Sequence, residues 1–219
     1  MKYKDLIDNV SKLEEEYELT ECIYFGAIEK LGEVQEDISK IDDAKHIRRI
    51  IRLFLINWGM MNRVVGRKDL EWKKLGETLR SLEKEFRELR DRKFLTTNFN
   101  ENTISNAIRT IYGKLDPFPY LGSPTTLSKI LHLLNPEIFV MWDNEIVKKY
   151  KKRNFRVSTT AEGYLEFLKD AQKEIKEALN DHQKESGKQL DEIEKELRAR
   201  CDNRTLARIV DEYNWMITR

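Results

Sequence analysis

The sequence predicts an all-α protein, and three observations lead to that fold class. All four prolines lie between Pro117 and Pro136, so the rest of the 219-residue chain keeps the backbone donors that helices need. Apolar side chains recur at steps of three and four residues, and no alternating strand pattern of useful length occurs. Charged residues form 36% of the chain, which suits exposed helical faces.

The first half of the chain predicts long helices with one apolar face each. The expected helices are Tyr3–Leu19, about Glu21–Val34, a helix from Asp42 or Asp43 as its N-cap to Met61, and Asp69–Lys93. Apolar residues are densest between Ile47 and Met61, which indicates burial on more than one side. We therefore expect that helix at the centre of the core and Asp69–Lys93 as a single surface helix.

The second half predicts shorter helices separated by clear breaks. Thr96–Asn102 is polar and reads as a loop, Asn135-Pro136 ends a helix, and Thr159–Glu162 has the pattern of a capping box. The expected helices are about Thr103–Lys114, Thr125–Leu134, Asn144–Lys151, a long helix from the capping box to about Asp181, Leu190–Arg200 and Arg204–Met216.

Length allows a single helical domain, 1–219, built either as one compact unit or as two lobes that share a cleft. The expected lobes are approximately 1–30 with 145–219, and 31–144. A formal net charge of +1 argues against a protein that coats nucleic acid through bulk electrostatics, so any such contact must be local.

Cysteine content and hydropathy restrict the class further. Cys22 and Cys201 are too few for a four-thiolate zinc site or an iron–sulfur cluster, so we expect no metal, no cofactor and a reduced, cytoplasmic location. No apolar run approaches the roughly 18–20 residues of a membrane span, and the first residues lack the apolar stretch of a secretory signal. The sequence thus predicts no membrane association.

One segment carries a motif. Phe118–Thr126 reads Phe-Pro-Tyr-Leu-Gly-Ser-Pro-Thr-Thr and is followed by Pro136, Phe139 and Asp143 in the pattern Pro-x-x-Phe-x-x-x-Asp. This arrangement resembles the helix-hairpin-helix signature, Leu-Pro-Gly-hydrophobic-Gly-x-x-Thr-Ala, and downstream aspartate of the DNA glycosylase superfamily that includes endonuclease III and the alkyladenine glycosylases. The resemblance covers Phe118–Asp143, about an eighth of the chain.

The resemblance implies a two-lobed glycosylase-like fold, duplex DNA as the partner and Asp143 as the catalytic carboxylate. It implies that a turn of backbone amides holds a DNA phosphate, in this chain through Tyr120, Gly122, Ser123 and Thr125. Tyr120 stands where the family has its first glycine. Pro124 stands where bifunctional members have a Schiff-base lysine, so the implied chemistry is a monofunctional N-glycosylase.

Neighbouring residues extend this interpretation. Lys129 lies one helical turn beyond the lysine position and is not expected to take over its role. Trp142 and Trp58 are candidates to stack on a flipped base. Phosphate contacts beyond the turn are expected from the basic residues that follow Asp143, namely Lys148, Lys149, Lys151 and Lys152.

Each of these interpretations has a structural alternative. Asp143 is also a natural N-cap, the tryptophans are also core aromatics, and His132 reads as a satisfied, semi-buried histidine. The basic residues also suit a solvated helix. Two functions therefore compete with an enzyme: a non-catalytic DNA-binding module, and a helical protein-interaction module with no nucleic acid partner.

Overall fold

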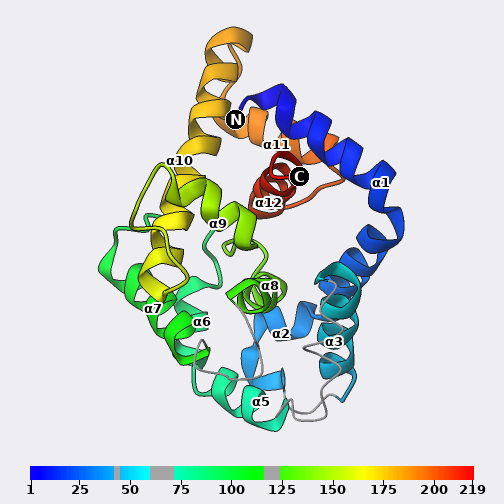
Figure 1. Ribbon diagram of the computed structural model, residues 1–219, viewed down its shortest axis with the longest axis vertical. Helices are drawn as coiled ribbons and strands as arrows, with labels where there is room; N and C mark the ends of the chain where they lie inside the picture. Colours follow the sequence, from blue (N-terminus) through cyan, green and yellow to red (C-terminus); the bar gives the residue numbers. More distant parts are fainter. Residues whose placement is uncertain (42–44, 60–71, 116–123) are drawn as a thin grey trace.

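The computed structural model describes residues 1–41, 45–59, 72–115 and 124–219. These residues form helices joined by turns, with no strand among them, so the all-α prediction is confirmed (Figure 1). In chain order the elements are α1 (Tyr3–Lys30), α2 (Gly32–Glu36), the 3₁₀ helix η1 (Ile38–Ile41), α3 (Lys45–Gly59), α5 (Trp72–Arg80), α6 (Glu83–Leu89), α7 (Asn102–Leu115), α8 (Pro124–Leu134), α9 (Asn144–Lys151), α10 (Ala161–Ser186), α11 (Leu190–Arg200) and α12 (Leu206–Ile217).

Helix α1 joins what the sequence predicts as two helices. Tyr17 interrupts it with φ −134° and ψ 31°, outside the helical region, and the helix bends there. The part before the kink buries Leu6, Val10 and Leu13, and the part after it buries Glu21 and Tyr24. Helix α1 packs on α3 and α12, and Glu21, in the part after the kink, contacts Arg208 of α12.

The centre of the fold is α8 rather than α3. Figure 1 shows α8 end-on among the other helices, and every residue from Thr126 to Leu134 is buried. In α3, by contrast, Leu53 is half exposed and Arg52 faces solvent, so the sequence prediction of the central helix was wrong. The sequence does not reveal this burial, because α8 contains polar side chains. In the fold, Ser128 and His132 can be buried because they form internal hydrogen bonds.

The predicted surface helix Asp69–Lys93 is also divided. Helices α5 and α6 are separated at Ser81 and Leu82, where Leu82 has φ −104° and ψ 11° and is fully buried. Helix α5 packs on η1 and α6 packs on α7. The break allows each half to turn its apolar face to a different partner.

The proposed caps Asp42 and Asp43 lie outside the described residues.

One contiguous cluster of buried apolar side chains extends from Tyr3 in α1 to Tyr213 in α12. In Figure 1, α1, α11 and α12 lie in the upper part and α2, α3, α5 and α6 in the lower part, with α10 running down to α7. The core therefore continues between the two predicted groups of helices. None of the helices in the described ranges combines the length and apolar character needed to cross a bilayer.

Candidate functional site

Asp143 begins α9 and uses one carboxylate oxygen to cap it. Its Oδ1 accepts hydrogen bonds from the backbone amides of Glu145 and Ile146, both at 2.9 Å. Its Oδ2 lies 3.9 Å from a guanidinium nitrogen of Arg219, and 23% of the side chain is exposed. The N-cap interpretation is therefore confirmed, and the second oxygen takes no part in the cap.

A cavity of about 290 Å³, the Asp143 cavity, lies beside this carboxylate. Its volume is near the lower end of the ~300–1,000 Å³ that is typical of small-molecule pockets. Residues from both predicted lobes line it: Leu13, Tyr17 and Thr20 of α1, Asn57 of α3, Thr125 and Lys129 of α8, Met141, Trp142 and Asp143 before α9, Ile146 of α9, and Asp211, Trp215 and Arg219 at the C-terminal end.

Charged groups of opposite sign face this cavity. Burial lowers the pKa of Lys129 to about 8, an effect that the nearby carboxylates of Asp211 and Asp143 oppose. Burial also raises the pKa of Asp211 to about 7 against the pull of Arg208 and Lys129. An amine and two carboxylates therefore share one small, poorly solvated space.

Three aromatic residues in the described part of the chain line the cavity, the predicted Trp142 and the unpredicted Tyr17 and Trp215. The rings of Tyr17 and Trp215 meet edge to face, with centroids 5.0 Å apart, and Tyr17 is 38% exposed. Trp142 is only 1% exposed, contacts Tyr164 and Phe167, and donates its indole N–H to the carbonyl of Pro124 at 3.2 Å. Trp142 thus lines the cavity as part of the core, and the side chain of Trp58 lies outside the described residues.

No family model, curated protein or solved structure matches the chain. Three predicted residues of the phosphate-binding turn, Tyr120, Gly122 and Ser123, fall outside the described residues. The fourth, Thr125, follows Pro124 in the first turn of α8 and lines the Asp143 cavity.

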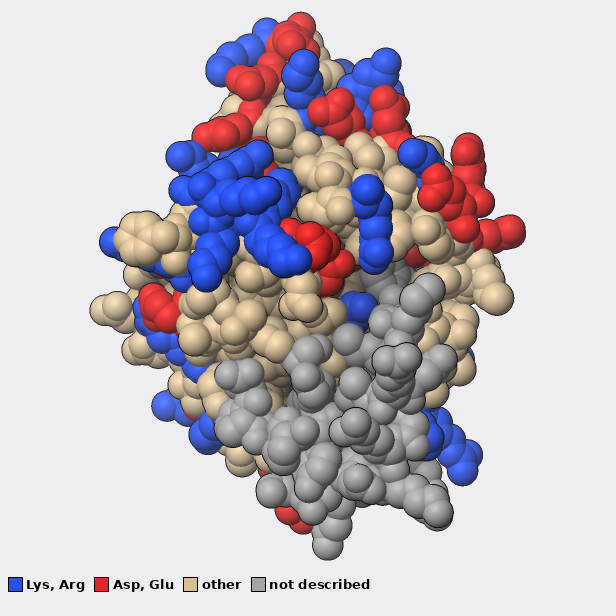
Figure 2. Space-filling model, viewed as in Figure 1, with Lys and Arg blue, Asp and Glu red and all other residues tan. Residues whose placement is uncertain are grey.

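A basic surface follows the cavity along α9. Lys148, Lys149, Lys151, Lys152 and Arg153 line a groove of about 770 Å³ with Glu145, Ile217 and Thr218. Figure 2 shows Lys and Arg side chains gathered on this face of the molecule, in the region of α9. The predicted basic residues therefore lie together on one surface next to Asp143.

The members of this surface differ in what they contact. Lys149 donates to Oδ1 of Asn214 at 2.7 Å, and burial lowers its pKa to about 8. Lys148 pairs with Glu145 at 2.6 Å. Lys151 and Lys152 are exposed, and no salt bridge to either is found in the described part of the chain. Lys151 and Lys152 are therefore the lysines of this surface that are best placed to contact an anion.

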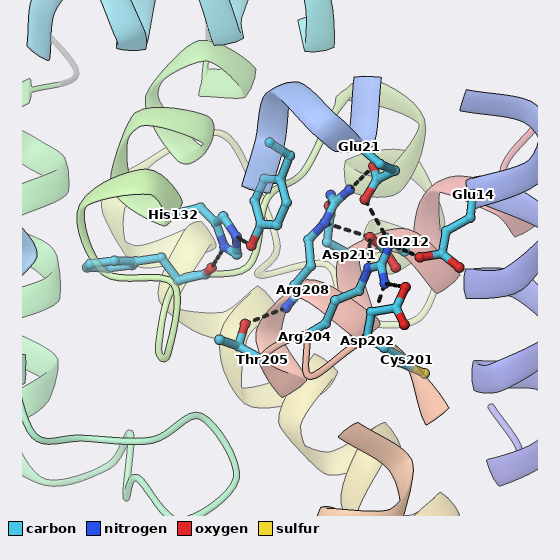
Figure 3. Close-up of polar contacts among 12 residues, drawn as sticks. Glu14, Glu21, His132, Cys201, Asp202, Arg204, Thr205, Arg208, Asp211 and Glu212 are labelled. Carbon is cyan, nitrogen blue, oxygen red and sulfur yellow. Dashed lines mark hydrogen bonds and ion pairs between the residues drawn. The ribbon is translucent and has the colours of Figure 1, made fainter. Parts of the chain in front are cut away.

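A buried ionic cluster between α1 and α12 went unpredicted. Arg204 and Arg208 are fully buried, and both guanidinium groups contact Glu21 of α1 and Glu212 of α12 (Figure 3). Arg208 lies 2.6 Å from each of these carboxylates, and Arg204 lies 3.0 Å from Glu21 and 2.9 Å from Glu212. Glu14, Asp202 and Asp211 add further carboxylates.

His132 lies beside this ionic cluster and is fully buried, more so than the semi-buried position expected. Its Nδ1 lies 2.6 Å from the carbonyl oxygen of Phe139, so Nδ1 is the donor, and Nε2 accepts from the Tyr24 hydroxyl at 2.9 Å. Burial lowers the His132 pKa to about 3. The side chain is satisfied and neutral. Within the described ranges no group of three or more His, Cys, Asp or Glu is arranged to hold a metal ion.

Proposed function

We propose that the protein binds duplex DNA through the basic surface and hydrolyses the N-glycosidic bond of a nucleotide extruded into the Asp143 cavity. The observation that carries this proposal is the position of Asp143. Its Oδ2 takes no part in the helix cap, and the residue lines a cavity that is also lined by an amine and by the rings of Tyr17, Trp142 and Trp215. A carboxylate, a cation and stacking surfaces are what a base-releasing site needs.

The proposed reaction is a displacement at C1′ by water. The C1′–N bond breaks and its electron pair leaves on the base, while a bond forms between C1′ and a water oxygen. One proton of that water ends on the base. The Asp143 carboxylate stabilises the positive charge that develops on the sugar and orients the water.

Lys129 is placed to assist the departure of the base in the same reaction. Even with its pKa lowered to about 8, most of the amine is protonated at pH 7, and it faces the cavity that would hold the base. An ammonium group there donates to base acceptor atoms and stabilises negative charge on the departing base. Tyr17 and Trp215 supply the stacking surface that the sequence interpretation gave to Trp142 and Trp58.

DNA contact is supported by the groove along α9. This helix spans eight residues, or about 12 Å, so the basic surface starts within a few base-pair steps of Asp143. A duplex lying on that surface places a nucleotide near the cavity. The net charge of +1 agrees with a local contact of this kind.

A non-catalytic DNA-binding module is the second candidate, and one observation favours it. The N-cap hydrogen bonds give Asp143 a complete structural role without any chemistry. The same basic surface then binds duplex DNA and releases no base.

The test is base release from duplexes that each carry one deaminated, alkylated or oxidised base. We expect the wild-type protein to release at least one of these bases and to leave an abasic site that alkali cleaves. Asp143→Asn should lower the rate by about 100-fold or more, in line with loss of a positioned acid or base.

The matched control is Glu29→Gln, which changes an exposed carboxylate of α1 that lines neither the cavity nor the basic groove. This variant should release the base at the wild-type rate. Release from none of the duplexes, or release that is unchanged in Asp143→Asn, would refute the catalytic proposal. Salt-sensitive duplex binding without product would then establish the non-catalytic module.

A further inference from the structure

Phe155 is the most exposed large apolar side chain in the described part of the chain. It follows α9 in the segment that leads to α10, and 84% of its surface is accessible. The next most exposed, Leu19, lies at 74% on α1. Single exposed apolar side chains are common on protein surfaces, so Phe155 is informative only together with its fixed backbone and its basic neighbours.

The segment that carries Phe155 is fixed rather than frayed. Asn154 donates from Nδ2 to Asp170 of α10 at 2.9 Å, and its Oδ1 accepts from the backbone amide of Arg156 at 3.1 Å. Its backbone carbonyl accepts from the amide of Val157 at 3.1 Å, and Val157 is fully buried. The residues on both sides of Phe155 are thus tied to the fold, and the ring is held outward.

Positive charge surrounds the ring in the sequence. Lys151, Lys152 and Arg153 precede it and Arg156 follows it, and the first three line the basic groove along α9. Arg153 is paired with Glu174. Among the described residues, no salt bridge reaches Lys151, Lys152 or Arg156, so these three charges are available to an anionic partner.

We propose that Phe155 is a wedge that inserts between adjacent base pairs of duplex DNA, while Lys151, Lys152 and Arg156 hold the flanking phosphates. Proteins that bend DNA use apolar side chains in this way, with cations on the neighbouring backbone. This inference rests on the proposed function, because it names how the same duplex is gripped. Phe155 acts on binding and bending, whereas Asp143 acts on the chemical step.

The positive charge next to Phe155 and the small apolar area of this segment favour DNA over a lipid surface as the partner. A membrane-binding segment needs a broad apolar face in addition to its basic residues. Here the exposed apolar groups are one ring, which is flanked by cations in the sequence, and Ile217 in the basic groove, while Val157 beside the ring is buried. A single ring matches the gap between two base pairs, where stacking on both sides removes it from water.

The test measures binding of the full-length protein to undamaged duplexes that carry 2-aminopurine at successive positions. Wild-type protein should raise the fluorescence at one base-pair step, because an inserted ring unstacks the probe. Phe155→Ala should lose this signal and weaken binding by about 10- to 100-fold, the usual range for one lost stacking contact. Phe155→Trp should keep both.

Salt dependence separates the ring from the charges. Phe155→Ala should leave the slope of log affinity against log salt unchanged, because the phosphate contacts remain. Lys151→Ala with Lys152→Ala should reduce that slope by about two. Leu19→Ala is the matched control, and it should match the wild type in every measurement. Circular dichroism melts confirm that each variant is folded.

Three outcomes overturn the wedge. The first is wild-type affinity and an unchanged 2-aminopurine signal in Phe155→Ala; if base release also persists there, the proposed function stands without the wedge. The second is no binding of any duplex by the wild type, which refutes both proposals. The third is binding to vesicles of anionic lipid that Phe155→Ala abolishes while duplex binding is unaffected. A 2-aminopurine signal and duplex binding in the absence of base release would support insertion of Phe155 and refute the catalytic proposal.

Discussion

Asp143 shows how one side chain serves both structure and a proposed reaction. A carboxylate has two oxygens, and the N-cap of α9 occupies only Oδ1. The Oδ2 atom lies 3.9 Å from Arg219 at the edge of the Asp143 cavity. The capping bonds hold the carboxylate in one orientation, which is what a positioned acid or base requires.

Two substitutions at Asp143 separate these roles. Asparagine retains an oxygen that accepts the two amide hydrogen bonds, so Asp143→Asn should change the free energy of unfolding by no more than about 0.5 kcal/mol. Alanine retains none, so Asp143→Ala should cost about 0.5–2 kcal/mol. Urea denaturation measures both values. An equal loss in the two variants would mean that the charge, and not the cap, supplies the stability.

Some site residues could be foreseen and others could not. The spacing from Pro136 to Asp143 and the lysines of α9 are local in sequence, so they predict a carboxylate next to a basic surface. Tyr17 and Trp215 lie almost two hundred residues apart and meet only through packing of α1 on α12. Nothing in either local sequence indicates the other. The local sequence therefore predicts Trp142, a buried residue that also lines the cavity, and gives no sign of Tyr17 and Trp215.

At the level of elements, the start of α10 depends on a close approach. Thr160 caps the helix by accepting from the amide of Gly163 at 3.1 Å, one residue later than the capping box predicted from Thr159. A methyl group at Gly163 would lie 2.2 Å from the carbonyl oxygen of Ser158 and 2.3 Å from its amide nitrogen. Only glycine fits there, because the obstacle is backbone.

Glycine-to-alanine substitutions test this constraint. Gly163→Ala should destabilise the protein by about 1–3 kcal/mol, because the segment at Ser158 must move. Gly26→Ala in α1 is the matched control: its added methyl meets nothing within 4 Å, so helix propensity should stabilise the protein by up to about 1 kcal/mol. Chemical denaturation gives both values. If Gly163→Ala left the free energy of unfolding unchanged, the backbone at the start of α10 could move at little cost.

Helix boundaries were predictable where the signals are local. The stop at Asn135-Pro136 follows from proline and the start of α9 from the Asp143 cap, and α9 and α11 begin and end as expected. The division between α5 and α6 was missed, since the apolar stripe continues across Ser81 and Leu82. In the fold, α5 packs mainly on η1 and α6 mainly on α7, and both partners lie elsewhere in the chain.

For the whole molecule, the ionic cluster joins α1 to α12 behind the Asp143 cavity. In sequence, Arg204, Arg208 and Glu212 are ordinary members of a charged helical face, spaced four residues apart. Their burial depends on Glu21, which lies far away in α1. Burial raises the pKa of Glu212 to about 8 and outweighs the attraction of Arg208 and Arg204. Asp211 is shifted in the same direction, to about 7.

These shifts make stability depend on pH. The pKa of an unfolded carboxyl group is ~4, and the folded pKa values of Asp211 and Glu212 are higher. Between these two pH values the folded chain holds protons that the unfolded chain has lost, so stability falls as pH rises through this window. His132 acts in the opposite sense. Its pKa is lowered to about 3, so its contribution is lost as pH falls from about 6.5 toward 3. Of these three groups, only Asp211 and Glu212 still change their protonation above pH 6.5.

Glu212→Gln tests the protonated state of the ionic cluster, because glutamine has the shape of a neutral glutamic acid. At pH 5.5 the variant should be about as stable as the wild type. From pH 5.5 to 7.5 the wild type should lose up to about 1.4 kcal/mol more stability per pH unit than the variant, the slope of one linked proton. Urea denaturation at pH 5.5, 6.5 and 7.5 measures this difference, with Glu29→Gln on the exposed face of α1 as the control. Equal slopes with a constant loss of stability would mean that Glu212 is ionised in the fold and that the two arginines hold it as a carboxylate.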